Sequence, residues 1–130
     1  MTTSIRCYEN IPNAPKAVGP YSPAVQAGGM VFLSGQVGLN PVTGQLIGPS
    51  IEEQTQQALN NLQSVLAGLG LSFSDVVKST IFLTDLGYFQ TVNKIYGDAL
   101  GGHRPARSTF QVSALPLGAI VEIEMIALAR

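Results

Sequence analysis

The apolar segment AIVEIEMIALA, residues 119–129, is the feature that most constrains the fold of this chain. Successive residues of a strand point to opposite sides, so alternate positions form one fully apolar face: Val121, Ile123, Met125 and Ala127. The other face carries Glu122 and Glu124 together with Ile120, Ile126 and Leu128. A solvated sheet face is seldom so apolar. We therefore expect helices over the first face and neighbouring subunits over the second, where a carboxylate is costly unless it is paired or used.

Two helices are predicted. The first covers residues 50–67, because Ser50 and Glu53 have capping-box spacing and apolar residues recur at three- and four-residue steps. Gly68 or Gly70 is expected to end it. The second is expected to run from a cap at Asp85 to about Leu100, before Gly101-Gly102. Its predicted inward residues are Leu86, Phe89, Val92, Tyr96 and Leu100.

The remaining segments predict strands. AVQAGGMVFLSG is typical of a hairpin around Gly28-Gly29, and strands are expected at 76–83 and about 107–112. Residues 10–23 hold four prolines, which exclude a helix there. The order is β-β-α-β-α-β-β, with room for one more strand at the N-terminus. This predicts an α+β fold for residues 1–130 as a single domain, with one mixed sheet and both helices on one face.

The composition limits the kinds of partner that this chain is expected to bind. Charged residues make up 12% of the chain, about half the usual share, so we expect apolar surface to be covered in a homo-oligomer. The net charge is −1 and no basic run exists, which argues against a nucleic-acid partner. No apolar stretch approaches about 18 residues, and the N-terminus lacks a signal-peptide pattern. We expect a cytoplasmic protein that does not bind membranes.

The available chemistry is narrow. One histidine and one cysteine, His103 and Cys7, cannot form a His/Cys zinc site, and we expect no metal. His103 lies in a glycine-rich loop and is expected to be solvated. By strand parity Arg107, Thr109 and Gln111 share a face, so an arginine and two glutamates are expected to meet in an apolar interface. From this pattern alone, a structural salt bridge at a subunit contact is favoured over a functional site.

Several segments of the chain carry a resemblance to a known family. They include GPYSPAVQAG, VFLSGQVGLNPVTG, DVVKSTIFLTD, FQTVNKIYGDAL, RPARSTFQV and LPLGAIVEIEMIA. Together they resemble the Rid family of reactive intermediate deaminases, above all its RidA-like 2-iminobutanoate/2-iminopropanoate deaminases, from about residue 8 to the C-terminus. The resemblance implies a chorismate-mutase-like fold, usually trimeric, with clefts between subunits. It also implies that the final strand lies between the first long strand and the 76–83 strand, so Arg107 and Glu122 approach across the interface.

The resemblance assigns roles to individual residues. Arg107 matches the arginine that binds the substrate carboxylate, for which a planar guanidinium is suited. Glu122 matches a glutamate placed near the attacking water. Thr109 stands where many relatives carry cysteine, so no thiolate nucleophile is expected, although Thr109 still offers a backbone N–H and a hydroxyl.

Four further residues match pocket-lining positions of the family: Tyr21, Ser34, Gly35 and Asn93. Each residue also has a purely structural alternative. Tyr21 would be a packed aromatic residue and Ser34 a turn former. Gly35 would meet a backbone requirement, and Asn93 would lie on the helix surface.

The predicted function is hydrolysis of short-chain 2-imino acids, with their enamine tautomers, to 2-keto acids and ammonia. Such imino acids leave dehydratases that use pyridoxal phosphate, and no cofactor is expected for their hydrolysis. The alternatives are a non-catalytic trimer that binds small carboxylates or acts like a chaperone and, less favoured, an endoribonuclease.

Overall fold

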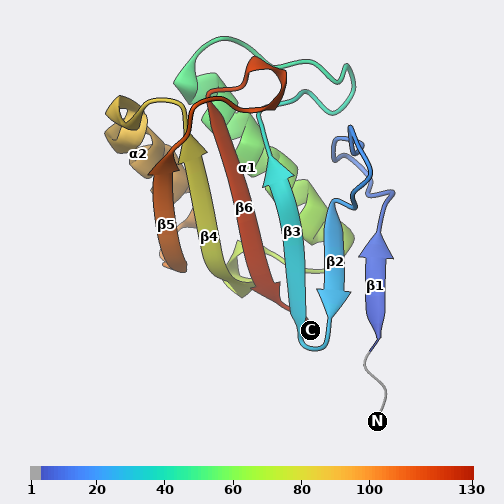
Figure 1. Ribbon diagram of the computed structural model, residues 1–130. Coiled ribbons are helices and arrows are strands. Elements are labelled where there is room, and N and C mark those ends of the chain that lie inside the picture. The colour runs from blue at the N-terminus through green and yellow to red at the C-terminus, as the bar shows by residue number, and fades with distance from the viewer. Residues whose placement is uncertain (1–3) are drawn as a thin grey trace.

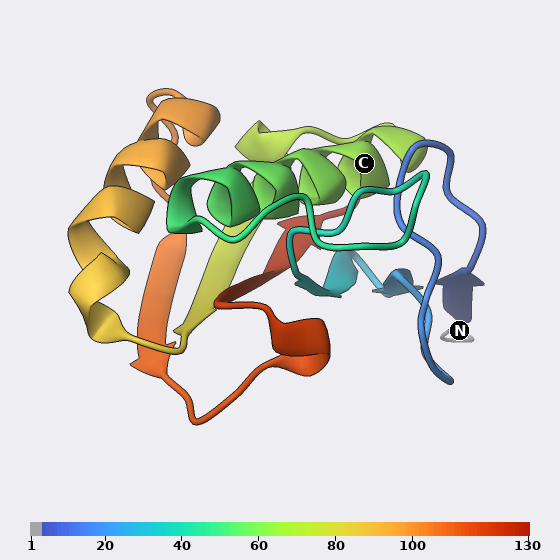
Figure 2. The ribbon, with the colours of Figure 1, turned by 90° about the horizontal axis from the view of Figure 1, so that it is seen from above.

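The computed structural model describes residues 4–130 as one six-stranded mixed sheet with two helices on the same face (Figures 1 and 2). The strands are β1 (Ile5–Tyr8), β2 (Ala24–Ala27), β3 (Met30–Gln36), β4 (Val76–Leu83), β5 (Ala106–Gln111) and β6 (Val121–Leu128). The helices are α1 (Ile51–Gly68) and α2 (Phe89–Leu100), and three short 3-10 turns complete the chain: η1 (Phe73–Asp75), η2 (Leu86–Tyr88) and η3 (Pro116–Gly118). The predicted α+β arrangement is confirmed, including the additional N-terminal strand.

Strand β6 lies near the middle of the sheet, whose order is β1-β2-β3-β6-β4-β5. It pairs antiparallel with both β3 and β4, as the resemblance implied, and only β4 and β5 pair in parallel. Helix α1 packs across β6 and β3, and α2 packs against α1. The predicted inward face of β6 is almost completely buried beneath the helices, at Val121, Ile123, Met125 and Ala127. Burial of this strand therefore organises the core.

Helix α1 begins and ends as its sequence signals predict. The Ser50 side chain accepts a hydrogen bond from the backbone N–H of Glu53. At the other end, Gly70 N–H donates to the Ala67 carbonyl and Leu71 N–H donates to the Leu66 carbonyl. These two bonds form a Schellman motif around Gly70, whose φ of 75° suits glycine. Of the two predicted glycines, Gly70 is thus the one in the left-handed position.

The start of α2 differs from the prediction. Asp85 caps the 3-10 turn η2, accepting a hydrogen bond from Gly87 N–H, and α2 begins only at Phe89. Because a 3-10 turn has about three residues per turn, Leu86 falls out of phase with the helix and is exposed. The expected inward position of Leu86 was therefore wrong, whereas Val92, Tyr96 and Leu100 are buried as predicted.

The strand predictions are confirmed with small shifts. Strands β2 and β3 form the expected hairpin, and Gly28 has a φ of 59° in its turn. Strand β5 begins and ends one residue earlier than expected.

The sheet face opposite the helices, here called the open face, carries large apolar side chains that this single chain does not cover. Phe32, Phe110 and Leu128 are each about half exposed. The rings of Phe82 and Phe110 stack there, with centroids 6.4 Å apart. An apolar face of this kind is typical of an interaction surface. Within residues 4–130, neither helix combines the length and the apolar content that a membrane crossing requires.

Two glycine-to-alanine substitutions should have opposite effects on stability. A Cβ at Gly38 would lie 2.7 Å from the Gln54 Cα and 2.8 Å from the Gln54 carbonyl oxygen. The backbone of α1 cannot move aside, so Gly38→Ala should destabilise the fold by about 2 kcal/mol. A Cβ at Gly97, inside α2, would meet no neighbouring atom within 4 Å, so Gly97→Ala should stabilise by about 0.5 kcal/mol. Urea unfolding at one protein concentration measures both, and equal effects would contradict this packing.

Candidate active site

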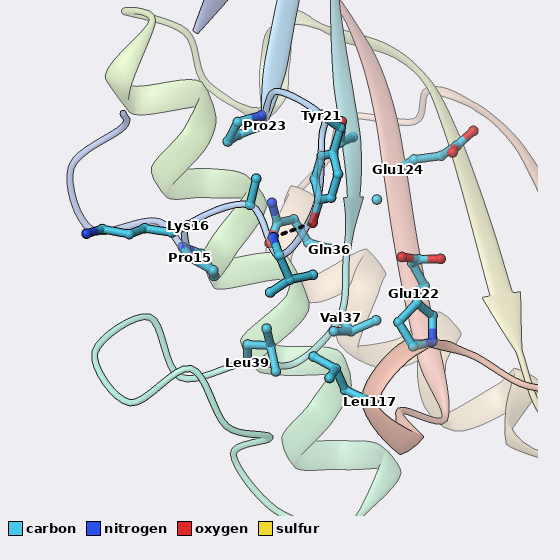
Figure 3. Close-up of a pocket in the computed structure, with 15 residues that line it drawn as sticks. Pro15, Lys16, Tyr21, Pro23, Gln36, Val37, Leu39, Leu117, Glu122 and Glu124 are labelled. Atoms are coloured by element: carbon cyan, nitrogen blue, oxygen red, sulfur yellow. Dashed lines mark hydrogen bonds between the residues drawn. The ribbon is translucent and has the colours of Figure 1, made fainter. Parts of the chain in front are cut away.

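The first concavity, here called the Glu122 pocket, lies where β3 and β6 approach the proline-rich loop before β2 (Figure 3). Its volume is about 360 Å³. Aliphatic side chains form much of the wall, among them Val18, Val37, Leu39 and Leu117. Glu122 and Glu124 line it from β6, and Tyr21 lines it from the loop. Three of the predicted pocket residues therefore line one cavity together with Glu122: Tyr21, Ser34 and Gly35.

Gly35 makes room for the carboxyl group of Glu122. The register of β3 against β6 shifts between Leu33 and Gln36, which places Gly35 at an irregular point of the strand. A Cβ at Gly35 would lie 2.8 Å from both Cδ and Oε2 of Glu122. Any side chain there would therefore displace the Glu122 carboxylate.

The Glu122 carboxylate is half-buried and has no partner in the part of the chain that the structure describes. No hydrogen-bond donor or cation from residues 4–130 contacts it. Burial raises the pKa of Glu122 above its ordinary value, and repulsion from Glu124 raises it further. A carboxylate with a raised pKa is a stronger proton acceptor when it is ionised.

Tyr21 and Ser34 have local hydrogen-bond partners. The Tyr21 hydroxyl accepts a bond from Val18 N–H at 3.3 Å, drawn as a dashed line in Figure 3. The Ser34 hydroxyl donates to the Ser22 carbonyl at 2.6 Å. Both bonds hold the proline-rich loop over the pocket, so these side chains shape the cavity as well as line it.

Two buried amides of α1, which the sequence reasoning missed, hold another part of the pocket wall. Asn61 donates to the carbonyls of Val37 and Leu39, at 3.2 and 2.9 Å. Gln54 donates to the Gly48 carbonyl and accepts from Ile120 N–H, both at 2.9 Å. The available signal was two amides seven residues apart on the inward face of a helix. Such buried amides must find partners, and here the partners are loop backbone groups.

The second concavity surrounds Arg107 and is called the Arg107 pocket. Arg107 Nη2 donates a hydrogen bond to Asn93 Oδ1. The guanidinium carbon lies 5.1 Å from the centroid of the Tyr96 ring and 5.6 Å from that of Phe89. No carboxylate within residues 4–130 forms a salt bridge with Arg107. Its guanidinium is therefore held by neutral groups and remains able to bind an anion.

Arg107 and Glu122 lie on opposite faces of the sheet in one chain. Arg107 is paired in register with Ser79, which is buried under the helices, whereas Glu122 is paired with Phe82 on the open face. The arginine and the two glutamates therefore do not meet within a single chain, and their expected meeting in an apolar subunit interface stays a prediction. Parity along each strand was correct, but the phase between strands depends on the register, which the sequence pattern does not reveal.

Three other predicted residues are placed as follows. Asn93 lies beside Arg107 and not in the Glu122 pocket. Thr109 lines neither pocket, and its Oγ1 is buried without a hydrogen-bond partner among residues 4–130. His103 is half-buried and not fully solvated as expected, because its Nε2 lies 2.7 Å from the Val76 carbonyl oxygen and ties the loop to the start of β4. Within residues 4–130, no three His, Cys, Asp or Glu side chains cluster closely enough to hold a metal ion.

Comparisons with known proteins agree with this architecture. Residues 11–129 match the family model described as Endoribonuclease L-PSP. The protein DfrA of Myxococcus xanthus is 54% identical over 89% of this chain and 90% of its own length. The mouse 2-iminobutanoate/2-iminopropanoate deaminase is 47% identical over 98% of this chain and 94% of its own. A crystal structure of a Rid-family protein from Yersinia pestis superposes with a TM-score of 0.91 at 46% identity, covering 98% of this chain and 100% of that one.

The fold and the family match define a small α+β protein of the L-PSP class. The chain belongs to the Rid family within that class, and it is RidA-like.

The raised pKa of Glu122 predicts how stability changes with pH. Because the folded pKa exceeds the unfolded value of about 4.3, folding favours the protonated form, and the ionised form lowers stability at neutral pH. Glu122→Gln should therefore raise the free energy of unfolding at pH 7. The gain should shrink as the pH falls towards 4, where the wild-type carboxyl is protonated.

Urea unfolding between pH 4 and pH 8 measures this difference, with Glu9→Gln on an exposed loop as the control. Destabilisation by Glu122→Gln at pH 7 would contradict a raised pKa in the assembled protein and would indicate that a cation of a neighbouring subunit pairs with the carboxylate.

Proposed function

We propose that this protein is a deaminase that hydrolyses short 2-imino acids, together with their enamine tautomers, to 2-keto acids and ammonia. The observation that carries the proposal is the unpaired, half-buried Glu122 carboxylate, held against Gly35 in a largely aliphatic pocket. The mouse relative, named as such a deaminase, aligns with nearly the whole of this chain. The aliphatic lining suits substrates with short apolar side chains.

We further propose that the active protein is a cytoplasmic homotrimer of the single domain 1–130, with a site at each subunit interface. Each site would join the Glu122 pocket of one subunit to Arg107 of its neighbour. The positions of the two residues support this arrangement, since one chain places them on opposite faces of its sheet. The apolar open face supports it too, because association would cover Phe32, Phe110 and Leu128.

In this proposal Arg107 binds the carboxylate of the imino acid. A guanidinium offers five N–H donors in a rigid fork, and among residues 4–130 Arg107 donates one side-chain hydrogen bond, to Asn93. Binding in this way would fix the position of C2 relative to the partner subunit. The backbone N–H of Thr109 is proposed to contribute a further donor, while Tyr21 and Ser34 shape the space for the substrate side chain.

Glu122 is proposed to act on water. It would accept a proton from a water molecule while the water oxygen attacks C2 of the protonated imine. Glu122 would then return that proton to the nitrogen of the resulting carbinolamine. As the C–N bond breaks and ammonia leaves, the carbinolamine hydroxyl would release its proton to the Glu122 carboxylate and the carbonyl would form. The protonated imine carbon is already electrophilic, so these proton transfers and the orientation by Arg107 account for the rate enhancement without a thiolate.

The description of the family model raises ribonuclease activity as a rival function. The described residues offer little for it, since the one histidine, His103, has its Nε2 bonded to a backbone carbonyl. The net charge of −1 and the lack of a basic run in the sequence also argue against strong binding of a phosphate backbone. A carboxylate-binding protein without catalysis is the other rival, and the following assay separates it from a deaminase.

Substitution of Arg107 tests the proposal. A dehydratase generates 2-iminobutanoate from threonine, semicarbazide traps the imine, and the release of 2-ketobutanoate is followed. Arg107→Ala should abolish the acceleration, and Arg107→Lys should lose at least about tenfold in kcat/KM because an ammonium lacks the planar fork. Arg6→Ala on β1, at the far edge of the sheet, is the matched control and should behave as wild type.

Full acceleration by Arg107→Ala would refute the assigned role. No acceleration by the wild type, together with binding of 2-ketobutanoate, would favour the non-catalytic alternative.

A further inference from the structure

We propose that Phe89, Asn93 and Tyr96 of α2 are positioning residues that orient the guanidinium of Arg107 before any carboxylate binds. The inference rests on the proposed function, because it explains how Arg107 would be ready to receive a substrate. The three residues form one unit, here called the α2 cradle.

The spacing of the cradle follows from helix geometry. Residues 89, 93 and 96 stand at positions i, i+4 and i+7, which lie on one face of an α-helix over two turns. The Arg107 guanidinium contacts that face at each of the three positions. Its carbon lies 5.6 Å from the Phe89 ring centroid and 5.1 Å from that of Tyr96, and Nη2 donates to Asn93 between them.

These contacts hold the arginine without neutralising it. An aromatic ring attracts a cation through its quadrupole, and the Asn93 amide oxygen accepts a hydrogen bond without carrying a charge. A carboxylate in the same place would form a salt bridge and would compete with a substrate carboxylate. The cradle therefore restrains a flexible side chain and leaves its charge available.

The position of the Tyr96 ring is fixed by a hydrogen bond to the sheet. Its hydroxyl donates to Ser79 Oγ at 2.8 Å, and both residues are buried. Ser79 on β4 is also the residue paired in register with Arg107 on β5. The hydrogen bond thus fixes the Tyr96 ring relative to the strand pair that carries the arginine. A purely apolar packing residue at this position would not need the hydroxyl.

Phe89→Leu tests the cradle most simply, because Phe89 is only half-buried and leucine keeps an apolar side chain at this position. Binding of 2-ketobutanoate should weaken about two- to five-fold, the contribution of a cation–π contact at a partly exposed site. In the coupled assay KM should rise by a similar factor while kcat changes little, as expected for lost substrate binding. Phe89→Tyr, which keeps a ring, should restore both values.

The mobility of Arg107 provides a second readout that a merely structural role would not change. The order parameter of its Nε–Hε group, from NMR relaxation, should fall in Phe89→Leu and in Tyr96→Phe, which breaks only the bond to Ser79. Tyr8→Leu is the matched control, because it removes the ring of the Arg6–Tyr8 cation–π pair on β1. It should leave Arg107 unchanged.

Unchanged order parameters in both cradle variants would overturn the inference, as would a fall in kcat at constant KM. If Arg107→Ala abolishes binding while Phe89→Leu binds normally, the cradle fails and the proposed function stands. If the wild type neither binds 2-ketobutanoate nor accelerates hydrolysis, the proposed function fails, and the order parameters alone decide whether the cradle restrains Arg107.

Discussion

The burial of one face of β6 is the interaction on which the rest of this structure depends. Val121, Ile123, Met125 and Ala127 alternate along a strand that lies between β3 and β4, and α1 packs across them. Because side chains alternate, burying this face places Glu122 and Glu124 on the open face of the sheet. The same strand thus organises the core and presents the carboxylate of the candidate site. Because Gly35 has no side chain, the Glu122 carboxylate can lie beside β3.

The candidate site is incomplete in a single chain. One chain presents an anionic group on the open face and a cationic group beside α2, each in its own pocket. Neither has an oppositely charged partner within residues 4–130. We propose that association supplies the missing half of each site from a neighbouring subunit. On this account the apolar open face and the two unpaired charges have one explanation, since covering the face also brings the two pockets together.

The alternating pattern of β6, the Ser50 cap of α1 and the Gly28-Gly29 turn were readable from the sequence because each signal is local. The exposure of Leu86 was not, because Asp85 caps a 3-10 turn before α2 and shifts the phase. The relative sides of Arg107 and Glu122 were not readable either, since they depend on register across three strands. The roles of Gln54 and Asn61 could not be predicted either, because their hydrogen-bond partners are backbone carbonyls whose positions depend on the path of the loop. Strand parity singled out Arg107 and the two glutamates as an interface group, but their roles in a functional site came from the family resemblance.

Mixed trimers test the central claim most directly. Arg107→Ala and Glu122→Gln subunits are unfolded, combined in equal amounts and refolded together, and each variant is refolded alone as a control. If every site takes Arg107 from one subunit and Glu122 from the next, each mixed trimer contains one intact site. Random assembly should then restore about a quarter of the wild-type rate of 2-iminobutanoate hydrolysis, whereas the separate variants stay deficient. A mixture no more active than its parents would contradict a site shared between subunits.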